Sequence, residues 1–132
     1  MKRESLDTNI LLRLLLRDNP KQYELALRLL ESKKVRYFVS DTAINELVFV
    51  LEGYYQFTRV QVGEIVNGLL EIGSIDCNRE LALHALNLYR THNSLSFGDC
   101  YLAASAKNMN AAPLWTFDKA LAAKAESAQL LV

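Results

Sequence analysis

Short runs of β-forming residues alternate with amphipathic helical patterns along almost the whole chain. We expect strands at 35–40 and 113–117, where β-branched and aromatic residues are dense. Briefer strands are expected just before Asp7, at 74–76 and at 129–132. Strands that alternate with helices form βα units and a parallel sheet. The sequence therefore predicts the α/β fold class.

Helix signals fill the intervals between these strands. Pro20 suits the first position of a helix, and Thr58 with Gln61 forms a capping-box pattern that opens another. The remaining helices are expected after Asn9 and over 41–54, 78–91, 96–108 and 118–125.

Size and charge agree with one globular domain covering residues 1–132. The chain is 51% hydrophobic, and fifteen Lys+Arg balance fifteen Asp+Glu. The charge is unevenly spread, because residues 1–36 hold nine basic and five acidic side chains, a net of +4 that the remainder cancels. A basic first third suits a polyanion held near a metal, although solvated helix faces explain most of these side chains individually.

The cysteine content and the hydropathy of the chain indicate where in the cell we expect the protein. Cys77 and Cys100 have no CxxC partner, so we expect two reduced thiols. No run is long and apolar enough to span a membrane. The apolar segment 10–16 is broken by Arg13 and lacks a cleavage site, unlike a signal peptide. We therefore expect a cytoplasmic protein that does not enter the membrane.

Four acidic residues fall at matching points of successive βα units. Asp7 and Asp118 directly follow predicted strands, whereas Glu46 and Asp99 are expected in the first turns of helices. Ligands of parallel sheets bind beyond the carboxyl ends of the strands, so this rule brings the four acids together. Four gathered carboxylates repel one another unless a cation joins them. The pattern predicts a divalent-metal site.

Each acid also has a purely structural explanation. Asp7 and Asp118 suit helix N-caps. Glu46 lies in a helix that is apolar almost all round, and a charge is seldom buried there without a partner. The helix dipole would also favour Glu46 near an N-terminus.

Asp99 has the most distinctive setting of the four. It is spaced i, i+3, i+4 and i+7 with Leu102, Ala103 and Ala106, so it heads what we expect to be an inward stripe. Asp99 also completes a capping-box-like pattern begun by Ser96. Both roles are compatible, because one carboxylate oxygen can accept from the backbone while the other binds metal.

The segments around these acids resemble the PIN domain family, and the size and motif set are similar to VapC-type toxins of bacterial toxin–antitoxin pairs. The resemblance covers nearly the whole chain, and the ordered set is more specific than any one motif. The matching segments are Leu6-Asp7-Thr8-Asn9, Asn45-Glu46-Leu47, Phe97-Gly98-Asp99-Cys100 and Thr116-Phe117-Asp118.

The resemblance implies a three-layer α/β/α fold with a short, mostly parallel five-stranded sheet. It implies a Mg²⁺- or Mn²⁺-dependent endoribonuclease that dimerises and is blocked by a cognate antitoxin. The acids implied to bind the metal and act in catalysis are Asp7, Glu46, Asp99 and Asp118.

Further polar residues complete the expected site. Thr8, Asn9 and Thr116 are candidates for positioning water around the metal ligands. The candidates for phosphate contacts are Arg13, Arg17 and Lys119, although surface solvation explains each of these alone.

Several alternatives stay open. The first predicted strand reads Lys2-Arg3-Glu4-Ser5, unlike a parallel strand buried on both faces, so it is either very short or atypically placed. A PIN nuclease for RNA processing, an enzyme acting on DNA, a non-catalytic metal- or RNA-binding module and a phosphoacceptor domain are competing functions. Trp115 is expected in the core, and the cluster of Tyr54, Tyr55 and Phe57 is expected in the core or at a partner interface.

Overall fold

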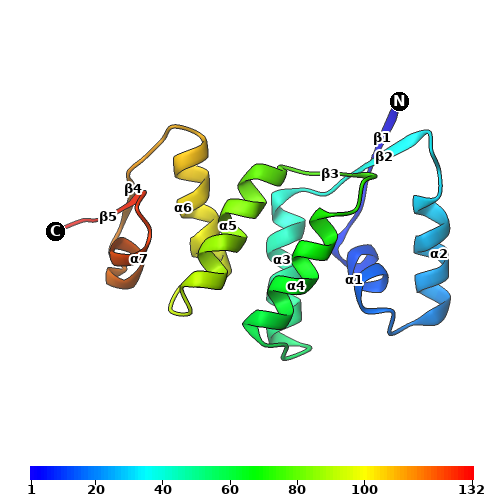
Figure 1. The fold of residues 1–132 in the computed structure, drawn as a ribbon, viewed down its shortest axis with the longest axis horizontal. Helices are drawn as coiled ribbons and strands as arrows, with labels where there is room; N and C mark the ends of the chain where they lie inside the picture. Colours follow the sequence, from blue (N-terminus) through cyan, green and yellow to red (C-terminus); the bar gives the residue numbers. More distant parts are fainter. The chain divides into compact units, whose positions relative to one another are not determined.

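The computed structural model describes residues 1–132 and divides the chain into two compact units, Met1–Asn78 and Arg79–Val132. Seven helices and five short strands are present, and every strand pairing is parallel (Figure 1). The α/β class predicted from the sequence is confirmed. None of the helices has both the length and the apolar character needed to cross a membrane.

The first unit contains a three-stranded sheet in the order β1-β2-β3. The strands are β1 (Lys2–Ser5), β2 (Val35–Phe38) and β3 (Ile75–Asp76). The middle strand β2 places Tyr37 between Glu4 and Ile75, and Tyr37 is buried. Within the first unit β1 pairs with β2, and its residues are mostly exposed, which agrees with its polar sequence.

Four helices accompany this sheet: α1 (Thr8–Leu16), α2 (Pro20–Leu30), α3 (Asp41–Gly53) and α4 (Arg59–Leu70). α1 packs against the other three helices, and α3 packs against α4 (Figure 1, blue to green). Burial of aliphatic side chains between them is the main stabilising term of this unit. The fully buried residues include Leu11, Ile44, Leu47, Leu51, Val62, Val66 and Leu69.

Local signals determine where these helices begin. Pro20 occupies the first turn of α2, where its missing N–H is no loss. Thr58 and Gln61 form the reciprocal capping box predicted from the sequence, with Oγ1 and Oε1 accepting from the backbone at 3.2 and 2.9 Å. Ser40 caps α3 by accepting from the Ala43 amide at 3.1 Å.

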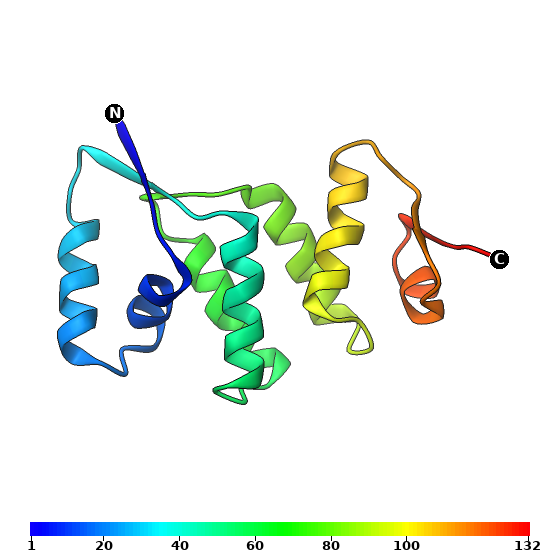
Figure 2. The same cartoon turned by 180° about the vertical axis from the view of Figure 1, so that it is seen from behind.

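The second unit is a helical hairpin followed by a βαβ segment. It contains α5 (Arg79–Thr91), α6 (Phe97–Asn108), β4 (Leu114–Thr116), α7 (Lys119–Lys124) and β5 (Ala128–Leu130). α5 packs along α6, and β4 pairs with β5 (Figure 2). Tyr89 and Phe97 meet edge-on at 5.3 Å between ring centroids and anchor the hairpin.

One expectation needs adjustment. The five short, parallel-paired strands agree with the α/β/α fold that the resemblance implied, with three in the first unit and two in the second. Trp115 was expected in the core, but its side chain is 55% exposed because alternate residues of β4 point to opposite faces. Cys77 and Cys100 form no disulfide, as expected.

Candidate metal centre

Asp7 lies at the junction between β1 and α1. It is the N-cap of α1, and its Oδ1 accepts a hydrogen bond from the Ile10 amide at 3.1 Å. The residue is exposed, so the carboxylate keeps capacity for a further ligand while it caps the helix. Helix capping and metal binding by Asp7 are therefore compatible.

Glu46 lies in the second turn of α3, and its residue is exposed. This corrects two expectations, namely that Glu46 is in the first turn and that it is enclosed by apolar neighbours. Ile44, Leu47 and Val48 point into the core, and Glu46 projects from the other side of the helix. A 3.6-residue period gives an apolar helix a polar face even where its sequence is mostly hydrophobic.

Asp7 and Glu46 line the same hollow in the first unit, with a volume of about 270 Å³. The hollow lies where α1 and α3 begin, each directly after a strand of the parallel sheet. Such strand ends are the usual ligand sites of α/β sheets. The lining residues are Leu6, Asp7, Thr8, Asn9, Ser40, Thr42, Ala43 and Glu46.

The chemistry of this hollow suits a hard cation. Its side-chain donors are two carboxylates, an amide and hydroxyls, and no lysine or arginine lines it. Mg²⁺ prefers oxygen ligands and is usually bound through one or two carboxylates with several waters retained. Two carboxylates with neighbouring hydroxyls fit that requirement. Neither unit contains a group of three or more His, Cys, Asp or Glu side chains that could hold a metal ion.

Asp99 belongs to the second unit and is half-buried in the first turn of α6. Its backbone amide donates to Ser96 Oγ at 3.1 Å, which confirms Ser96 as the helix cap. The predicted inward stripe is wrong in one member, because Leu102 is 56% exposed. The buried stripe instead follows Phe97, Cys100, Tyr101 and Ala104, at the same i, i+3, i+4, i+7 spacing.

Asp118 is the N-cap of α7 and is exposed. Its Oδ1 accepts from the Leu121 amide at 3.0 Å, and its own amide donates to Thr116 Oγ1 at 3.0 Å. The Thr116 hydroxyl thus fixes the turn from β4 into α7. Of the four predicted acids, the structure brings Asp7 and Glu46 together and places Asp99 and Asp118 within the second unit.

The three predicted phosphate contacts have different surroundings. Arg13 donates to Asp18 Oδ1 at 2.7 Å and to the Tyr55 hydroxyl at 3.2 Å. The Tyr55 hydrogen bond, with the nearby Asp18 charge, holds the pKa of Arg13 above its usual range.

Arg17 and Lys119 are both exposed. The Arg17 guanidinium lies over the Tyr23 ring at 4.9 Å from its centroid. Lys119 is the first residue of α7, next to Asp118.

Sequence reasoning missed the hydroxyls of Ser40 and Thr42, which line the hollow beside Glu46. Their signal was the position of Ser40 at the end of the predicted strand 35–40. Thr8 and Asn9 were predicted near Asp7, and both line this hollow.

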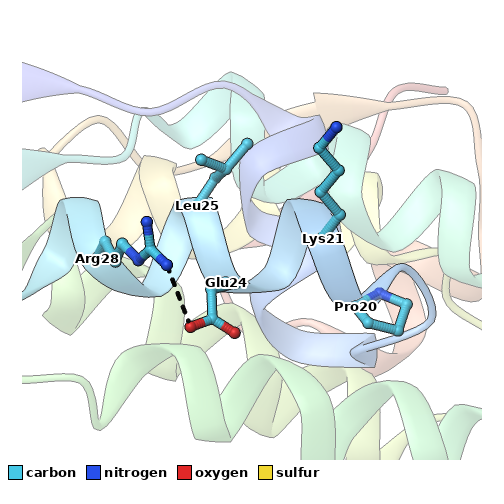
Figure 3. A pocket seen from close by; sticks show the side chains of 5 residues that line it. All are labelled: Pro20, Lys21, Glu24, Leu25 and Arg28. Carbon is cyan, nitrogen blue, oxygen red and sulfur yellow. Dashed lines mark ion pairs between the residues drawn. The ribbon is translucent and has the colours of Figure 1, made fainter.

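A larger hollow of about 550 Å³ lies on α2 and has different chemistry (Figure 3). Its one carboxylate, Glu24, pairs with Arg28 at 3.5 Å. The other lining residues are Pro20, Lys21 and Leu25. With two cationic side chains and a single paired carboxylate, this surface does not suit a divalent metal.

Comparison with known proteins adds an independent finding. Residues 5–127, nearly the whole chain, match the family described as PIN domain. No curated protein matches the sequence.

Proposed function

We propose, because the chain belongs to the PIN domain family, that it is a Mg²⁺- or Mn²⁺-dependent endoribonuclease and the toxin of a toxin–antitoxin pair. The family supports a divalent-metal nuclease that hydrolyses phosphodiester bonds. RNA as the substrate, the choice of metal and the toxin role are carried by the resemblance of the four acidic segments to VapC-type toxins.

The observation that best supports a metal-dependent nuclease is the shared hollow of Asp7 and Glu46. Two carboxylates from distant segments line it among hydroxyl and amide oxygens, with no cation to neutralise them. Carboxylate, hydroxyl and amide oxygens are the ligands that a hard divalent cation takes in proteins, so this donor set suits a bound ion.

We assign metal binding and catalysis to Asp7, Glu46, Asp99 and Asp118. A bound divalent ion supplies charge stabilisation at a phosphodiester oxygen and a water that loses its proton more readily. Asp7 and Asp99 would hold this ion, and Glu46 or Asp118 would orient the attacking water and accept its proton. Both candidates for that base are exposed, so water reaches them.

Neighbouring polar residues hold these acids in place. Thr116 accepts from the Asp118 amide and so sets the turn that presents this carboxylate. Thr8 and Asn9 line the hollow next to Asp7, where an amide and a hydroxyl can hold water. Arg13, Arg17 and Lys119 supply positive charge for the RNA backbone.

A cognate antitoxin and a second copy of this chain are the proposed protein partners. Exposed apolar side chains are compatible with such interfaces, and Val60 and Leu25 are 70% and 59% exposed. The partners themselves are taken from the family resemblance.

The test is an incubation of the purified protein with total RNA in Mg²⁺, Mn²⁺ or EDTA, followed by mapping of the cut ends. We expect discrete cuts with either metal and none in EDTA. Asp99→Asn is the matched control, because the amide keeps the shape of the carboxylate and the Ser96 cap uses only the backbone of Asp99. Cleavage by Asp99→Asn at the wild-type rate would overturn the site assignment.

The toxin role has its own test. Induced expression of the wild-type chain should arrest bacterial growth, and Asp99→Asn should not. Metal-dependent RNA cleavage without growth arrest would favour a processing nuclease over a toxin.

A further inference from the structure

A second hollow adjoins the carboxylate hollow in the first unit. Its volume is about 430 Å³, and it shares Asn9 with the hollow that holds Asp7 and Glu46. Its lining residues are Asn9, Leu12, Arg13, Asp18, Val50, Tyr54 and Tyr55.

The two hollows follow the same pair of packed helices, α1 and α3. Glu46, Val50 and Tyr54 are spaced four residues apart, so they lie on the same face of α3 toward its C-terminal end. Along α1, Asn9 and Arg13 are spaced in the same way. At the helical rise per residue, Tyr54 lies about 12 Å along the axis from Glu46. A nucleic-acid strand with its phosphate at the carboxylates would place a nearby base at Tyr54.

Tyr54 has the properties of a stacking platform. Its side chain is 80% exposed at the end of α3. The ring meets Tyr55 edge-on, at 5.0 Å and 80°, and Tyr55 stacks on Phe57 at 5.7 Å. Tyr54 thus has one ring contact, with Tyr55, and most of its surface stays open to a planar ligand.

Polar groups beside this ring suit the edge of a base. The Arg13 guanidinium carries five N–H donors, and Asp18 and Tyr55 accept from two of its nitrogens. Tyr55 in turn donates to Asp18 Oδ2 at 2.9 Å, which closes the cluster and fixes its orientation. Donors and acceptors thus lie at the wall of the hollow next to an exposed aromatic ring.

We propose that this hollow is a base-binding subsite, in which a nucleobase close to the cleaved phosphodiester stacks on Tyr54 and meets Arg13 and Asp18 with its edge. The inference rests on the proposed nuclease function, because the bound base belongs to the RNA strand whose phosphate lies at the carboxylate hollow. Single-stranded RNA is recognised in this manner, by stacking on aromatic side chains and contacts to splayed base edges. Aromatic residues and arginine are also enriched at protein interfaces, but this hollow adjoins the carboxylate hollow at Asn9, which favours a nucleobase as its occupant.

The test measures binding in Ca²⁺, a hard cation that also takes carboxylate ligands, and each probe is checked afterwards to be uncut, so that cleavage does not enter the comparison. Two fluorescein-labelled probes of equal length are used, an oligouridylate and the matching oligomer of abasic ribose phosphates. Stacking on Tyr54 predicts that the wild-type protein prefers the oligouridylate by between about fivefold and a hundredfold. Tyr54→Ala should abolish the preference, and Tyr54→Phe should keep it.

Phe49→Ala is the matched control. Its ring is 75% exposed on the same helix, but it does not line the hollow. This variant should keep the wild-type preference.

Three results would overturn the inference: no preference in the wild type, a preference that survives Tyr54→Ala, or an equal loss in Phe49→Ala. The second of these, together with loss of self-association in Tyr54→Ala by light scattering, would assign the ring to a protein interface. Failure of the nuclease proposal is seen separately, as absence of metal-dependent cleavage of total RNA.

Discussion

Asp7 caps α1 and Glu46 lies one turn into α3, yet their side chains line one hollow. The parallel pairing of β1 with β2 produces this meeting, because it starts the two following helices at the same edge of the sheet. Asp7 therefore has two roles, as the N-cap of α1 and as a proposed metal ligand, and substitutions can separate them.

Asp7→Asn should fold as the wild type does and lose activity. Asparagine is as good an N-cap as aspartate, so the hydrogen bond from the Ile10 amide survives. Loss of the charge should slow metal-dependent cleavage by more than about a hundredfold, since even outer-shell substitutions at metal sites cost about 10- to 100-fold. Asp7→Ala should lose the activity and also about 1 kcal/mol of unfolding free energy. Urea unfolding and a cleavage assay on each variant measure the two effects, and an active Asp7→Asn would contradict the assignment.

Glu46→Gln should weaken metal binding without changing the stability of the metal-free protein. The residue is exposed and has no helix cap to lose. A saturating metal stabilises the fold it binds, by about 2.7 kcal/mol at a hundredfold excess over Kd. Mn²⁺ should therefore raise the Tm of the wild type by more than that of Glu46→Gln. Glu64→Gln, an exposed change on α4, is the control and should respond to Mn²⁺ like the wild type.

Helix boundaries followed closely from the sequence because their signals are local. Pro20, Thr58 with Gln61, and Ser96 each specify a helix start through backbone groups within three residues. The strand positions followed from β-forming residues and from their alternation with helices. The pairing order was beyond this reasoning, since it depends on contacts between distant segments.

Exposure was the weaker part of the sequence prediction. Glu46, Leu102 and Trp115 were all expected to face inward, and all three are exposed. An apolar sequence states which side chains favour burial, but helix packing decides which face is covered. The same limit applied to Tyr54 and Arg13, whose shared hollow forms only when α1 packs beside α3.

Tyr55→Phe should lower the free energy of unfolding of the first unit by about 1 kcal/mol, which is the typical net contribution of an intramolecular hydrogen bond. The hydroxyl accepts from Arg13 and donates to Asp18, and it links α1 to the end of α3. Urea unfolding measures the change. Tyr23→Phe is the control, because phenylalanine keeps the ring under the Arg17 guanidinium. Equal stability of Tyr55→Phe and the wild type would show that solvent replaces these hydrogen bonds without cost.

Asp76→Asn should remove a stabilising contribution that depends on pH. Asp76 accepts from Arg36 Nε at 2.7 Å and lies 3.4 Å from Arg3 Nε, so one carboxylate joins the three strands of the sheet. The Arg36 hydrogen bond is the main reason that the pKa of Asp76 is lowered. The pKa of Asp76 is lower in the folded chain than in the unfolded chain, where it is about 3.9, so the ionised carboxylate stabilises the fold at pH values above that unfolded value. This contribution is lost as the pH falls through the folded pKa. The wild type should therefore exceed Asp76→Asn in unfolding free energy near pH 6, and the difference should vanish in stronger acid. Denaturant unfolding at several pH values measures it, with Glu64→Gln as the control, and a difference constant at every pH would contradict the linkage.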